Sequence, residues 1–163
     1  FVTLFLGILN LQTGELRFSN AGHNPPLILE HDGRCQYLTL PDGFVLGGLP
    51  EMEYTDDSVQ LDSGDMIVTY TDGVTEAMNP QRLLYSEERL QETVASLAGQ
   101  DVKETVAAIF ASVRKHAAGA PQSDDIAVLA YKGQIKQRHD PLPVQPGLKG
   151  KVKLINAFYK WQT

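Results

Sequence analysis

Two short apolar segments, each with an aspartate at one end, constrain the fold of this chain more than any other feature. Residues 66–70 (Met-Ile-Val-Thr-Tyr) are rich in β-forming side chains and lie between Gly64-Asp65 and Asp72-Gly73. This pattern predicts a buried strand followed by a sharp turn, because glycine lets the backbone turn tightly. Residues 126–131 are a second strand-like run, and Ser123-Asp124-Asp125 stands at its entry.

The positions of these aspartates suggest a cation site. If the two strands are antiparallel neighbours, Asp72 and Asp124 meet at the same edge of the sheet. Carboxylates that close are unfavourable unless a cation lies between them, and hard divalent cations prefer oxygen ligands. The alternative is that Asp72-Gly73 is only a turn, since Asp and Gly dominate turns. The sequence alone does not show that the strands are neighbours.

The charge of the chain is divided between an acidic body and a basic tail. Residues 1–133 carry 8 Lys or Arg and 19 Asp or Glu, a net charge of −11, whereas residues 134–163 carry 6 and 1, a net charge of +5. The acidic body argues against a nucleic-acid-binding surface. No apolar run approaches the roughly 20 residues of a membrane helix, and there is no signal-peptide pattern. With Cys35 as the single cysteine, we expect a cytoplasmic protein.

The remaining pattern predicts a mixed fold with strands and helices. Further strands are expected at residues 1–9, 16–20, 27–30, 36–40 and 57–61, and an irregular segment at 41–54. Ser86 and Asp101 are expected to cap two helices, the second of which carries an apolar stripe of Val102, Val106, Ile109 and Val113.

Polar residues next to these elements have both a functional and a structural interpretation. His23 and Asn24 lie in a Gly- and Pro-flanked loop, where they either contribute to the rim of a site or brace a turn through backbone hydrogen bonds. We favour the structural role, because most polar turn residues are structural. Glu76 would share a helical face with Asn79, and it either orients a metal-bound water or caps the turn.

Three motifs in order resemble the metal-dependent (type 2C) serine/threonine phosphatases, nearest the bacterial branch represented by stage II sporulation protein E and RsbU. The motifs are Asn20-Ala21-Gly22-His23-Asn24-Pro25-Pro26, Tyr70-Thr71-Asp72-Gly73-Val74-Thr75-Glu76-Ala77 and Gln122-Ser123-Asp124-Asp125-Ile126. The resemblance implies an α+β fold, an antiparallel β-sandwich with flanking helices. It implies that residues 1–132 are the C-terminal part of such a phosphatase domain, and that residues 133–163 are a basic linker, a tail or the start of a further segment.

The resemblance also implies a site and a reaction. Two Mn²⁺ or Mg²⁺ ions would be bound by Asp72 and Asp124 with the backbone at Gly73, and Asp125, Glu76, His23 and Asn24 would lie around these ligands. The implied reaction is hydrolysis of phosphoserine or phosphothreonine by a metal-bridging water, without a side-chain nucleophile. The implied substrate is a phosphorylated bacterial regulatory protein, a STAS-type anti-sigma-factor antagonist in stress or developmental signalling. A homodimer is a further expectation.

One family motif is not found in these residues. The family has an earlier Asp-Val-Ser-Gly-like motif whose Asp bridges both metals, so we expect the domain to be incomplete at its N-terminus, with half of the metal site in this chain. A non-catalytic phosphatase-like module that binds a phosphoprotein or regulatory partner is therefore the alternative function. A purely structural β-sandwich is a third possibility.

Overall fold

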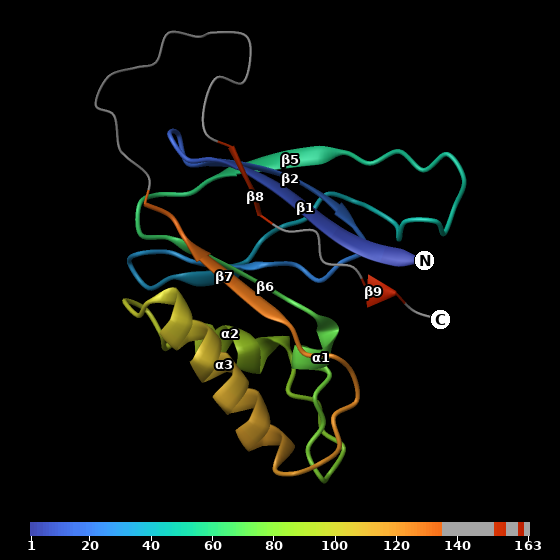
Figure 1. Cartoon of the computed structure of the whole chain (residues 1–163), viewed down its shortest axis with the longest axis vertical. Helices are drawn as coiled ribbons and strands as arrows, with labels where there is room; N and C mark the ends of the chain where they lie inside the picture. The colour runs from blue at the N-terminus through green and yellow to red at the C-terminus, as the bar shows by residue number, and fades with distance from the viewer. Residues whose placement is uncertain (135–151, 156–159, 162–163) are drawn as a thin grey trace, which may run out of the picture. The chain divides into compact units, whose positions relative to one another are not determined.

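The computed structural model describes residues 1–134, 152–155 and 160–161, which are coloured in Figure 1. They form two compact units. The first contains residues 1–23, 40–64 and the described residues from 133 onward, and the second contains residues 24–39 and 65–132. Each unit is built on an antiparallel sheet, and the three helices belong to the second. The predicted α+β class with antiparallel sheets is confirmed.

The first unit is a sheet with the strand order β5-β2-β1-β8, and the short strand β9 also pairs with β1. Its strands are β1 (Val2–Asn10), β2 (Glu15–Ala21), β5 (Asp56–Gln60), β8 (Val152–Ile155) and β9 (Lys160–Trp161). Side chains alternate along β2, which buries Leu16 and Phe18 and exposes Arg17. Phe18 stacks on Phe5 of β1, with ring centroids 5.9 Å apart.

A hairpin joins β1 and β2. Gly14 has a φ of 81°, a left-handed conformation that glycine adopts without a steric cost. The Asn10 side chain accepts hydrogen bonds from the backbone N–H groups of Gln12 (2.9 Å) and Thr13 (3.2 Å). These bonds satisfy donors that the turn removes from the strand ladder.

The second unit is a sheet with the order β4-β3-β6-β7, and its α2 and α3 helices lie against one face (Figure 1). Its elements are β3 (Leu27–Leu29), β4 (Cys35–Tyr37), β6 (Met66–Tyr70), α1 (Asp72–Thr75), α2 (Glu87–Ala95), α3 (Val102–Ala117) and β7 (Val128–Lys132). Every residue of β6 is buried, as its continuous apolar sequence predicted. Within the described residues, none of the helices has the length and apolar character needed to cross a membrane.

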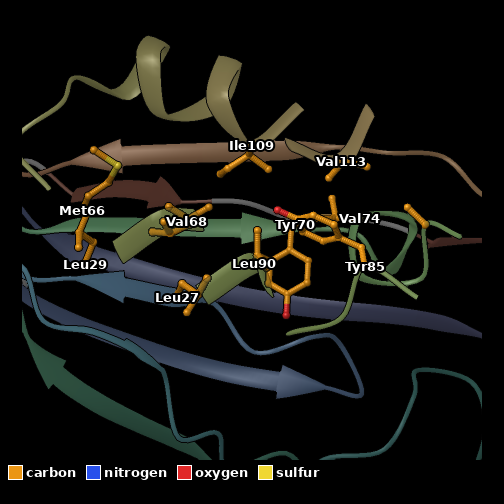
Figure 2. Close-up of a cluster of buried hydrophobic side chains, with 12 residues drawn as sticks. Leu27, Leu29, Met66, Val68, Tyr70, Val74, Tyr85, Leu90, Ile109 and Val113 are labelled. Carbon is orange, nitrogen blue, oxygen red and sulfur yellow. The ribbon is translucent and has the colours of Figure 1, made fainter. Parts of the chain in front are cut away.

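The core of this unit lies between the sheet and the helices. Figure 2 shows Ile109 and Val113 extending from α3 toward Val68, Tyr70 and Val74. Met66, Val68 and Tyr70 are two residues apart along β6, so they share the face that meets the helices. The predicted apolar stripe of α3 is confirmed in part: Ile109 and Val113 are buried, whereas Val102 and Val106 are half-buried.

The two predicted helix caps have different outcomes. Asp101 accepts a hydrogen bond from the Glu104 backbone N–H at 2.8 Å, and the Glu104 side chain accepts one from Asp101 in return, which is a capping box. Ser86 occupies the N-cap position of α2, but its side chain makes no capping hydrogen bond. The predicted Ser86 cap is therefore wrong. Ser86 has a φ of 75° and a ψ of 162°, far from the extended backbone that lets a serine hydroxyl reach the N–H of the second or third helical residue.

One strand also starts later than predicted. Strand β7 begins at Val128 rather than Ile126, because the Thr71 side chain replaces part of the ladder there. The predicted basic tail lies mostly outside the described residues.

Candidate metal centre

Strand β6, which ends before Asp72, and strand β7, which begins after Asp124, are antiparallel neighbours. Met66 to Tyr70 of β6 pair with Lys132 to Val128 of β7, so the exit of β6 and the entry of β7 meet at the same edge. Asp72 lies two residues after Tyr70, and Asp124 lies four residues before its partner Val128. The condition on which the predicted cation site depended is therefore fulfilled.

Thr71 extends this pairing beyond the ends of the strands. Its N–H donates to the Ala127 carbonyl at 3.0 Å, and its Oγ1 accepts from the Ala127 N–H at 2.9 Å. The same Oγ1 donates to the Asp125 carbonyl at 2.7 Å. One hydroxyl therefore holds the Ser-Asp-Asp segment next to the Asp-Gly segment.

Gly73 is the point of closest approach between these two segments. A Cβ on Gly73 would lie 2.5 Å from the Asp125 carbonyl oxygen and 3.1 Å from that of Asp124. Gly73 has no positive φ and lies in the first turn of α1, a helix that starts at Asp72. The predicted sharp turn at Asp72-Gly73 is therefore wrong. The glycine is needed because another backbone passes over it, and not because of its own φ.

The two candidate ligands lie on either side of this contact. Oδ1 of Asp72 is buried, although the residue as a whole is half-buried. Asp124 is also half-buried, and its Oδ1 accepts a hydrogen bond from the Asp125 N–H at 2.7 Å. The Asp124 carbonyl accepts a hydrogen bond from the Gln122 side chain at 2.7 Å. The backbone around both carboxylates is thus fixed by hydrogen bonds.

This donor set fits part of a divalent metal site. Carboxylate oxygens at one sheet edge are the ligands that Mg²⁺ and Mn²⁺ prefer. In the part of the chain that the structure describes, no three His, Cys, Asp or Glu side chains are grouped to hold a metal ion. That Asp72 and Asp124 bind a metal ion stays a prediction, and the described residues place no third side chain of this kind with them.

The residues predicted to lie around the ligands are only partly brought together. Asp125 contacts Asp124 through its N–H, and Glu76 ends α1 with its carbonyl 3.4 Å from Ser123 Oγ. Both side chains are exposed. Glu76 does not share a helical turn with Asn79, because the helix ends at Thr75.

His23 and Asn24 belong to different units. In the first unit, His23 is buried, its Nδ1 lies 3.2 Å from Thr3 Oγ1, and its N–H donates to Asn20 Oδ1 at 3.3 Å. These contacts agree with the bracing role that we favoured. In the second unit, the Asn24 side chain interacts with the Tyr70 hydroxyl. Whether either residue contributes to the metal site stays a prediction.

Tyr70, directly before the Thr-Asp-Gly segment, was not predicted as a residue of the site. Burial raises the pKa of its hydroxyl above the ordinary value of 10.0, and the side chains of Tyr37 and Asn24 partly oppose this shift. Burial also raises the pKa of Tyr37, whose hydroxyl donates to the Glu87 carbonyl at 2.8 Å. Both phenols are therefore neutral near pH 7 and add no negative charge beside the two aspartates.

A pocket of about 130 Å³ also adjoins this edge and was not predicted. Its walls come from α3, from the segment around α1 and from the chain that leads to β7. They include Gly73, Met78, Val113, Arg114, Ala117 and Ile126. No local pattern indicates such a pocket, because its walls are distant in sequence.

Known proteins are similar in sequence to this chain. The family described as Stage II sporulation protein E (SpoIIE) matches residues 1–134. Protein IcfG of Synechocystis is 35% identical over 130 residues, which cover 80% of this chain and 20% of IcfG. The phosphoserine phosphatase RsbU of Bacillus subtilis is 29% identical over 115 residues, which cover 71% of this chain and 34% of RsbU. The chain thus spans about a fifth of one curated relative and a third of the other.

Solved structures share the fold. The RsbU and RsbW domains of Rv1364c from Mycobacterium tuberculosis match with a TM-score of 0.66 and 25% identity, over 83% of this chain and 38% of that one. The phosphatase domain of the cell fate determinant SpoIIE from Bacillus subtilis matches with a TM-score of 0.64 and 20% identity, over 86% of this chain and 59% of that one. The second likeness shows the fold alone.

Proposed function

The chain belongs to the SpoIIE family of phosphatases, and from this premise we propose that it takes part in metal-dependent hydrolysis of phosphoserine or phosphothreonine. The observation that supports the proposal most directly is the meeting of the Asp72 and Asp124 segments at one sheet edge. The name of RsbU, a phosphoserine phosphatase, supports phosphoserine as the substrate group.

The residues of this chain have separate parts in the proposed mechanism. Asp72 and Asp124 would hold Mn²⁺ or Mg²⁺, while Thr71 and Gly73 set the distance between the two segments. When bound, the ions supply an activated water and offset the negative charge of the phosphoryl oxygens. Tyr70 stays neutral near pH 7, because burial raises the pKa of its hydroxyl, so it adds no charge to that of the two carboxylates.

The proposed substrate is a phosphorylated bacterial regulatory protein of the STAS-type anti-sigma-factor antagonist class. This class follows from the resemblance to the SpoIIE and RsbU branch. A regulator of transcription is cytoplasmic, so we propose the same compartment for this protein. A homodimer stays a prediction, and both candidate ligands, Asp72 and Asp124, come from one chain.

The proposal is tested by phosphate release from a phosphoserine protein with Mn²⁺. Loss of a residue that hydrogen-bonds to a metal ligand typically costs about 10–100-fold in activity. We expect Asp72→Asn and Asp124→Asn, which change proposed ligands themselves, to reduce the rate by more than this. Asp42→Asn is the matched control, because Asp42 is an exposed carboxylate of the other unit. Calorimetric titration with Mn²⁺ should show weaker binding in the same two variants. An Asp72→Asn variant as active as the original chain would overturn the proposal.

One observation favours the binding module as a second candidate function. The described residues supply two acidic ligands and no third, and such a site binds metal more weakly than a complete one. A chain that binds the phosphoprotein but releases no phosphate would support this candidate. Release that depends on Asp72 and Asp124 would exclude it.

A further inference from the structure

The pocket beside the candidate metal centre has the size and lining of a site for one apolar side chain. Val113 and Ala117 of α3 form one wall, and Met78 and Ile126 stand among the other lining residues. Its volume of about 130 Å³ is close to that of engineered apolar cavities of about 150 Å³, which bind benzene. A leucine, methionine or phenylalanine side chain matches this space.

The pocket adjoins the two segments that contain Asp72 and Asp124. Gly73 and Ser123 both line it, and they are the direct neighbours of Asp72 and Asp124 in the chain. A ligand group held between the two aspartates would therefore have its next few atoms at the pocket mouth. Its position beside both aspartate segments distinguishes the pocket from a packing defect inside the core.

The charge at the pocket suits an anionic ligand. Arg114 lines the pocket, is exposed and forms no ion pair with any residue in the described ranges. Lys115 follows it in the last turn of α3 and is also exposed. These cations stand out in a body with a net charge of −11 over residues 1–133. Positive charge next to an apolar pocket matches a peptide that carries both a phosphate and a large apolar side chain.

We propose that this pocket binds an apolar side chain of the phosphoprotein close in sequence to its phosphorylated residue, and that Arg114 attracts the phosphorylated segment. The inference rests on the proposed function only for the nature of the ligand, a phosphoprotein. It adds a specificity determinant: the substrate segment carries a leucine-sized residue at one fixed position relative to the phosphoserine.

The test uses fluorescent, alanine-rich phosphoserine peptides in which one position at a time carries leucine. Fluorescence anisotropy with this chain and Mn²⁺ measures their affinities, so the readout does not depend on catalysis. We expect one leucine position to bind at least about 10-fold more tightly than the all-alanine phosphopeptide, the effect of burying one large apolar side chain. We expect the same leucine peptide without phosphate to bind more weakly.

Variants of the pocket locate the effect. Ala117→Leu adds carbon atoms to the pocket wall and should remove the preference for leucine. Ala111→Leu is the matched control, since Ala111 is an exposed alanine of the same helix outside the pocket. Met78→Ala enlarges the pocket and should shift the preference from leucine to phenylalanine. If Ala117→Leu fails to fold, the Met78→Ala variant tests whether the pocket sets the leucine preference.

Charge variants test the part assigned to Arg114. Arg114→Gln should weaken every phosphopeptide by a similar factor, while Lys103→Gln, an exposed cation in the first turn of the same helix, should change little. Equal effects of the two variants would overturn the role of Arg114.

The outcomes separate this inference from the proposed function. Phosphate release without any leucine preference would overturn the inference and leave the phosphatase proposal standing. A leucine preference that Ala117→Leu or Met78→Ala alters, without phosphate release, would support the inference and count against catalysis. A leucine preference that neither folded variant alters would place the apolar contact elsewhere and overturn the inference.

Discussion

Gly73 has no room for a side chain, because the backbone of residues 124–125 passes over it. We expect Gly73→Ala to lower the free energy of unfolding by roughly 1–3 kcal/mol, as overpacking does, since the clashing atoms are backbone and cannot rotate away. It should also weaken Mn²⁺ binding, because relief of the clash moves the Asp124 segment away from Asp72. Urea unfolding and calorimetric Mn²⁺ titration measure the two effects.

Gly119→Ala is the matched control for this prediction. Gly119 has a φ of 86° and nothing within 4 Å of an added Cβ, so alanine there is strained but does not clash. We expect a loss of about 1–2 kcal/mol in stability with unchanged Mn²⁺ affinity. If Gly73→Ala and Gly119→Ala had the same effect on Mn²⁺ binding, the close approach at Gly73 would not position the aspartates.

At this scale the sequence predicted which two segments come together, but not what holds them. Asp72 and Asp124 were identifiable because each stands at the end of a strand-like run. The part of Thr71 was not predictable, since its three hydrogen bonds are to residues 125 and 127, more than 50 positions away. The same holds for Tyr70, whose pKa shift comes from burial in the folded unit.

At the scale of elements, the start of α2 contains a strained residue. Ser86 combines a φ of 75° with a ψ of 162°, a region that is nearly exclusive to glycine and costs of order 1–3 kcal/mol. We therefore expect Ser86→Gly to raise the free energy of unfolding, measured by urea denaturation. The lost side-chain hydrogen bond to Glu88 is exposed and offsets little of this gain.

Ser96→Gly tests the opposite end of the same helix. Ser96 has an ordinary helical φ of −66°, so glycine there should lower stability by about 0.5–1 kcal/mol. A destabilised Ser86→Gly variant would show that Ser86 contributes contacts that outweigh its backbone strain.

The elements themselves were largely predictable, and the exceptions share a physical cause. Local pattern located the strands and both long helices, because periodic burial and capping are encoded within a few residues. Helix α1 was missed, since its four residues carry no apolar period and only the close approach at Gly73 explains the glycine. The late start of β7 has the same origin, a tertiary contact made by Thr71.

At the scale of the whole chain, the described part of the basic tail adds strands to the first unit. β8 pairs with Gly7 to Asn10 of β1, and β9 pairs with Val2 and Thr3. The other edge of β1 is occupied by β2, so the tail strands cover the second edge. An uncovered edge of this length presents backbone donors and acceptors that pair readily with another chain.

We therefore expect a chain ending at residue 134 to lose protection of the β1 amides that face away from β2, while β2 and β5 keep theirs. Hydrogen exchange with mass spectrometry measures this. Sedimentation should show that the shortened protein self-associates, because its uncovered β1 edge can pair with a second copy. Leu154→Pro controls for the lost positive charge, because it removes a backbone donor from β8 and leaves the net charge unchanged. If both variants kept the β1 amides as protected as in the full chain, the tail strands would not cover this edge.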